Sequence, residues 1–126
     1  MRQETTRQPG WGVVATVAGL LLVASLVPVP GGPAGSSGGR VLFALAHVLG
    51  YGLLAGTLAL AVRRTACPRW QVTLAVFVAV VGYGAAIEGL QGLGSHRTFS
   101  HADIALNALG AVVGLTCAWL WDRASG

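Results

Sequence analysis

The sequence predicts an all-α protein, a bundle of four transmembrane helices with both termini in the cytoplasm. Three observations support this fold class: 54% of the 126 residues are hydrophobic, only 10% are charged, and the mean hydropathy is +0.69. A typical soluble domain has roughly 25% charged residues. Eight basic and four acidic side chains are too few to cover the surface of a soluble globule of this size. We therefore exclude a soluble globule and a disordered chain.

Four segments are apolar enough to cross the hydrocarbon core of a bilayer, which takes about 20 helical residues. The predicted spans are Trp11–Val29, Val41–Val62, Trp70–Leu90 and Ala102–Trp121. This pattern predicts three parts: a cytoplasmic N-terminal tail (residues 1–10), a four-helix membrane domain (residues 11–121) and a C-terminal tail (residues 122–126).

The first apolar run could also be a signal peptide, because Arg2 and Arg7 precede it. It is longer than the apolar core of a usual signal peptide, and the prolines at Pro28 and Pro30 make a poor cleavage site. We therefore expect a retained helix that these prolines end.

The arginines are divided unequally between the two ends of the predicted helices. With a cytoplasmic N-terminus, the outer side holds only Arg40 and Arg97, and the cytoplasmic side holds Arg2, Arg7, Arg63, Arg64, Arg69 and Arg123. Basic loops stay preferentially in the cytoplasm. The sequence thus predicts a multi-pass protein of the cell membrane with both termini inside.

No nucleic-acid partner is expected, because the basic residues flank apolar segments and form no basic face with interleaved aromatic residues. Cys67 and Cys117 show neither a metal-binding nor a disulfide spacing. The loop histidines His96 and His101 have no defined zinc spacing. We therefore expect no metal and no other cofactor.

Small residues recur at four-residue spacing, in the pairs Gly52/Gly56 and Gly110/Gly114. In lipid, such pairs let helix backbones approach closely. They predict a tight bundle, and the same faces could also serve oligomerisation.

Polar side chains within or beside the spans gather toward one end of the bundle. Because successive helices alternate in direction, groups from three helices and one loop should converge on the outer leaflet. They are His47, Tyr51, Glu88, Gln91, Arg97, Asp103 and Asn107. An ionisable group at the centre of a membrane helix costs at least about 2.5 kcal/mol, so such residues need a functional or a structural reason.

Two spacings among these residues resemble the signature of the VanZ-like family of small membrane proteins. They are His47-x3-Tyr51 on an earlier helix and Glu88-x2-Gln91-x5-Arg97-x2-Ser100-x2-Asp103-x3-Asn107-x2-Gly110 on the last two. The resemblance covers roughly residues 40–115. Family members usually carry an Asp-Lys pair shortly before the histidine, where this sequence has Phe43 and Ala44. The resemblance implies a cell-envelope protein. It also implies a link to glycopeptide (teicoplanin) resistance for founding members of the family, but no settled reaction.

If the protein is catalytic, we expect Glu88, Asp103 and His47 to act as acid and base. The guanidinium of Arg97 can bind a phosphate through two parallel hydrogen bonds. The expected partner is a membrane lipid, and the expected substrate class is a phosphorylated or polyprenyl-linked envelope lipid. The remaining expected substrate ligands are Gln91, Asn107 and Tyr51.

These residues also have structural interpretations, which the sequence leaves open. Ser100-x2-Asp103 fits the N-terminal cap of a helix, and His47 can donate a hydrogen bond to a carbonyl. Gln91 and Asn107 can form hydrogen bonds between helices. In that case the polar cluster only locks the bundle, and the protein is a non-catalytic scaffold or modulator.

Overall fold

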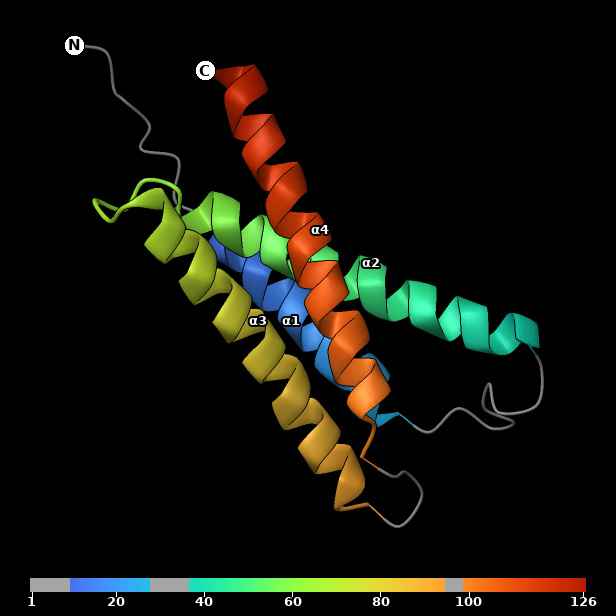
Figure 1. Ribbon diagram of the computed structural model, residues 1–126. Coiled ribbons are helices and arrows are strands. Elements are labelled where there is room, and N and C mark those ends of the chain that lie inside the picture. Colours follow the sequence, from blue (N-terminus) through green and yellow to red (C-terminus); the bar gives the residue numbers. More distant parts are fainter. Residues whose placement is uncertain (1–9, 28–36, 95–98) are drawn as a thin grey trace.

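The computed structural model describes residues 10–27, 37–94 and 99–126. These ranges contain four α-helices and no strand, which confirms the predicted all-α fold class (Figure 1). The helices are α1 (Trp11–Leu26), α2 (Ser37–Val62), α3 (Arg69–Gly92) and α4 (His101–Ser125).

Three of the helices are long and apolar enough to cross a membrane. Helices α2, α3 and α4 have 26, 24 and 25 residues, so each is more than about 35 Å long at 1.5 Å per residue. Helix α1 is apolar but has only 16 residues. It ends at Leu26, before the expected end of the first span at Val29. Pro28 and Val29 themselves lie outside the described residues.

Two threonine hydroxyl groups on the spanning helices form hydrogen bonds within their own helix. The side chains of Thr57 and Thr116 each donate to the carbonyl four residues earlier, at 2.8 Å. Apolar side chains cover much of the exposed surface, as a lipid-facing bundle requires.

Helices α2 and α4 cross with their backbones in contact (Figure 1). A Cβ atom added at Gly114 would overlap the carbonyl oxygen of Gly52, and one added at Gly110 would lie 2.6 Å from the carbonyl oxygen of Val48. At Gly56 the corresponding distance, to the carbonyl oxygen of Gly114, is 3.3 Å. The two predicted glycine pairs therefore pack against each other within one chain.

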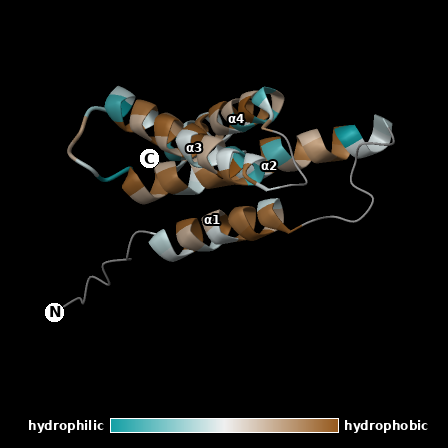
Figure 2. Ribbon diagram, turned by 90° about the horizontal axis from the view of Figure 1, so that it is seen from below, coloured by the Kyte–Doolittle hydropathy of each residue, from teal (hydrophilic) through white to brown (hydrophobic). Residues whose placement is uncertain are grey.

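Helix α1 forms a separate layer beside the other three helices (Figure 2). None of its residues is fully buried. The hydroxyl of Tyr83 on α3 donates to the carbonyl of Ala18 at 2.6 Å. A Cβ atom added at Gly50 on α2 would lie 2.6 Å from the side chain of Leu21 on α1. This layer is tied to α2 and α3 by packing and a few hydrogen bonds.

An ion cluster lies at the end of the bundle where α2 and α4 end and α3 begins. Asp122 accepts from Arg69 at 3.3 Å and lies 3.7 Å from Arg63. The guanidinium of Arg123 lies 3.9 Å from the ring centroid of Trp119. We call this the arginine end; the arginine count predicts that it faces the cytoplasm, and the orientation remains a prediction.

The α2–α4 crossing predicts opposite effects for two glycine-to-alanine changes. Gly114→Ala forces the helices apart, so it should lower the free energy of unfolding by about 1–3 kcal/mol. Gly82→Ala is the control, because a Cβ at that position meets nothing within 4 Å and alanine favours a helix by roughly 0.5–1 kcal/mol. Circular dichroism during unfolding in mixed micelles measures both. Equal stabilities would contradict the crossing.

The predicted orientation can be tested with single cysteines in a Cys67→Ser/Cys117→Ser background. Leu93, 87% exposed, follows α3 at the end opposite the arginine end, and Leu93→Cys should react with an impermeant thiol reagent in intact cells. Thr65 lies between α2 and α3, and Thr65→Cys should react only after the cells are opened. The reverse pattern would invert the orientation.

Candidate functional site

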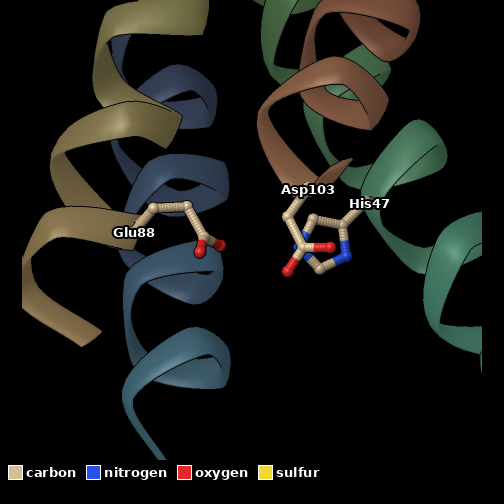
Figure 3. Close-up of side chains that lie close together, drawn as sticks. All are labelled: His47, Glu88 and Asp103. Atoms are coloured by element: carbon tan, nitrogen blue, oxygen red, sulfur yellow. The ribbon is translucent and has the colours of Figure 1, made fainter. Parts of the chain in front are cut away.

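Three helices bring His47, Glu88 and Asp103 together at the end of the bundle opposite the arginine end. One ring nitrogen of His47 and one carboxylate oxygen of each acidic residue all lie within 4.8 Å of one another. Figure 3 shows Glu88 extending from α3 toward Asp103 on α4 and His47 on α2. Glu88 is only 3% exposed, and the other two are half-buried. We call these three residues the polar cluster.

The imidazole of His47 is oriented by its own helix. Its Nδ1 atom lies 3.1 Å from the carbonyl oxygen of Phe43. A carbonyl oxygen can only accept, so Nδ1 carries the hydrogen and Nε2 is left for another partner. The ring also packs between Phe43 and Tyr51, with centroid distances of 4.3 and 6.1 Å. The hydrogen bond that a structural interpretation of His47 required is therefore present, and it fixes the ring for a further interaction.

Ser100 joins the two carboxylate-bearing helices. As the N-cap of α4, its hydroxyl accepts from the backbone N–H of Asp103 at 3.2 Å. Its own N–H donates to Oε2 of Glu88 at 3.3 Å. The predicted cap is confirmed, and it uses the backbone of Asp103, which leaves the carboxylate to the polar cluster.

A second layer lies one helical turn deeper. Each of its members, Tyr51, Gly84 and Asn107, is four residues from a member of the polar cluster, on the same helix face. A Cβ at Gly84 would overlap the amide nitrogen of Asn107 and lie 2.9 Å from Cε1 of Tyr51. The absence of a side chain on α3 thus makes room for these two. Gly84 was not identified from the sequence. Its position one helical turn before Glu88 was the only indication, and the chain contains 19 glycines.

Asn107 is fully buried, at 0% exposure. Neither its amide nitrogen nor its oxygen has a hydrogen-bond partner within the described ranges. A buried unpaired polar group costs about 1–3 kcal/mol. The interhelical hydrogen bond that a structural role would supply is therefore not formed among these residues, and the predicted role of Asn107 as a ligand remains a prediction.

Gln91 turns toward α1 instead of the polar cluster. Its amide nitrogen donates to the carbonyl of Ser25 at 2.5 Å, as the structural interpretation expects. Its oxygen is buried and has no partner in the described part of the chain. Arg97 and His96 lie outside the described residues. The exposed His101 contacts Phe99 edge-on at 4.9 Å and belongs to no described group of metal-type ligands.

The profile of the VanZ/LLP1 family matches residues 9–122, which is nearly the whole chain. This chain belongs to the VanZ/LLP1 family. The match includes every residue of the polar cluster and of the layer beneath it, so the family resemblance noted in the sequence is confirmed. No curated protein and no solved structure matches the chain. The chemistry of this VanZ/LLP1 site therefore follows from its own residues.

The second layer predicts a coupled effect of two substitutions. Gly84→Ala should destabilise the protein by about 1–3 kcal/mol, because its methyl group overlaps Asn107. Asn107→Ala removes the overlapping atoms, so the double variant should recover part of this loss. Gly89→Ala is the control on the same helix, since a Cβ there meets nothing within 4 Å. Unfolding midpoints in detergent give all four values. Additive effects of the two substitutions would contradict the contact.

Proposed function

We propose that this VanZ/LLP1 membrane protein acts in the cell envelope, where it binds the phosphate-bearing headgroup of an envelope lipid at the outer leaflet. The observation that carries the proposal is the convergence of His47, Glu88 and Asp103, from three helices, at the end of the bundle opposite the arginine end. Ionisable residues within membrane-spanning helices usually mark a functional site.

A lipid headgroup fits the position of the polar cluster. Asp103 lies in the first turn of α4, and Glu88 lies four residues before the end of α3 at Gly92, about 6 Å along the helix. The surrounding α2 surface exposes Leu42, Leu45 and Leu49. A ligand with a polar head and hydrocarbon chains can contact the cluster and this apolar surface at once.

Six of the seven polar residues have a role in this proposal. Arg97, outside the described residues, binds the phosphate through its planar guanidinium. His47, Glu88 and Asp103 are the groups that could transfer protons if the bound lipid reacts. Asn107 and Tyr51 position the ligand from below. Founding members of the family are linked to glycopeptide resistance, which supports an envelope lipid as the target.

A structural scaffold is the competing function, and specific contacts favour it. Gln91 holds α3 to α1 through Ser25, and Ser100 holds α4 to Glu88. In a scaffold these hydrogen bonds would be the whole purpose of the polar residues. Substitutions that keep shape and remove charge separate the two functions.

Glu88→Gln should leave the protein folded and abolish most of its function, because an amide cannot act as a base or balance a cation. Asp122→Asn is the matched control, since it makes the same chemical change at the arginine end. Mass spectrometry of envelope lipids from cells carrying each variant measures function, and melting temperature measures folding. A folded, fully active Glu88→Gln variant would favour the scaffold.

Arg97→Lys should insert and fold normally but lose most lipid binding, because lysine cannot supply two parallel donors to one phosphate. An arginine that served only orientation would be replaced by lysine without loss. Native mass spectrometry of bound lipid and a glycopeptide-resistance assay give the two readouts. Full activity of Arg97→Lys would remove the bidentate contact from the proposal.

A further inference from the structure

We propose that His47, Glu88 and Asp103 bind one divalent metal ion of the zinc class, with a coordination position open to a phosphate oxygen. Metal binding is argued from the cluster alone, and only the identity of the bound phosphate rests on the proposed function. The sequence led us to expect no metal because it considered His96 and His101. The fold instead brings His47, which lies more than 40 residues earlier, to the two carboxylates.

The donor set suits such an ion. One imidazole nitrogen and two carboxylate oxygens give three protein ligands, the number typical of zinc sites that keep a fourth position open for water or substrate. Imidazole favours zinc and neighbouring transition metals over magnesium and calcium.

The geometry is close to that of a metal site. A point equidistant from three atoms that are 4.8 Å apart lies about 2.8 Å from each, compared with roughly 2.0–2.2 Å for bonds from zinc to nitrogen or oxygen. The difference is under about 1 Å for each ligand, which side-chain rotation can supply because each donor atom lies at the end of a rotatable side chain.

The hydrogen bond of His47 is the one that a metal ligand needs. A ligating histidine usually donates its other ring N–H to a carbonyl or carboxylate, which fixes the tautomer and the ring orientation. Here Nδ1 donates to Phe43 at 3.1 Å, so Nε2 presents a lone pair. A metal ion bound between this lone pair and the two carboxylates would interact favourably with all three groups.

A divalent ion would also balance the two negative charges that Glu88 and Asp103 carry when both are ionised. Its open coordination position would attract a phosphate oxygen.

The layer beneath the cluster supplies an independent observation. The amide oxygen of Asn107 is completely buried and has no partner among the described residues, although it lies on the face of Asp103, one turn deeper. A water bound to the metal would donate to this oxygen and satisfy it.

Zinc binding is measured on the full-length, tag-free Cys67→Ser/Cys117→Ser protein, which removes two exposed thiols. After treatment with a chelator, the protein in detergent is titrated calorimetrically with Zn²⁺ and, separately, with Mn²⁺. We expect one ion per chain. His47→Gln and Asp103→Asn should each weaken binding at least about tenfold, since even second-shell changes weaken metal sites 10–100-fold. His101→Gln is the control and should change nothing.

The result that overturns the metal site is absence of stoichiometric binding of either ion, or binding that His47→Gln leaves unchanged. A separate arm measures binding of dioleoyl phosphatidic acid in nanodiscs with and without EDTA. If EDTA abolishes lipid binding, the phosphate binds through the metal ion. If lipid binding is unchanged in EDTA, the phosphate does not bind through the metal ion, and that part of the proposal is wrong. If the lipid never binds but zinc does, the metal site stands and the proposed function fails.

Discussion

Where α2 and α4 cross, their backbones touch, because Gly52, Gly110 and Gly114 carry no Cβ. Helices in contact at one point fix the relative height of every residue near that point. His47 lies five residues before Gly52, about 7.5 Å along α2, and Asp103 lies seven residues before Gly110, about 10 Å along α4. The glycine contact thus sets the separation of the imidazole and the carboxylate. Any side chain added there would move the polar cluster apart as well as the helices.

The bilayer supplies the second constraint, because polar groups on these helices have no water to turn to. Ser100 forms hydrogen bonds with two helices. Its hydroxyl accepts from the N–H of Asp103 on α4, and its own N–H donates to Glu88 on α3. The amide nitrogen of Gln91 donates to the carbonyl of Ser25 near the end of α1. Asn107 is different, since its buried amide has no such partner in the ranges described. The packing that admits Asn107 against Gly84 therefore favours a ligand or water in the site over a purely structural bond.

Much of this account could be predicted from the sequence. Apolar run lengths predicted the helices, and alternating direction predicted that Glu88 and Asp103 would share one end. Two features could not be predicted, because each depends on neighbours distant in sequence. Gly84 matters only because Asn107 and Tyr51 pack where its side chain would be. The sequence placed His47 at the same end as the carboxylates, but its approach to within 4.8 Å of both depends on how α2 crosses α4.

The central claim is that His47 and Asp103 meet in the membrane-embedded protein, and a solid-state NMR distance tests it most directly. The chain is labelled with ¹⁵N-histidine and ¹³Cγ-aspartate in a His96→Gln/His101→Gln background, so that one histidine and two aspartates remain. Asp122 lies at the arginine end, so Asp103→Asn identifies the signal. The imidazole nitrogen and a carboxylate oxygen lie within 4.8 Å of each other, so we predict a measurable coupling between that nitrogen and Cγ, at about 6 Å or less once the C–O bond is added. The absence of measurable coupling in lipid bilayers would contradict the polar cluster.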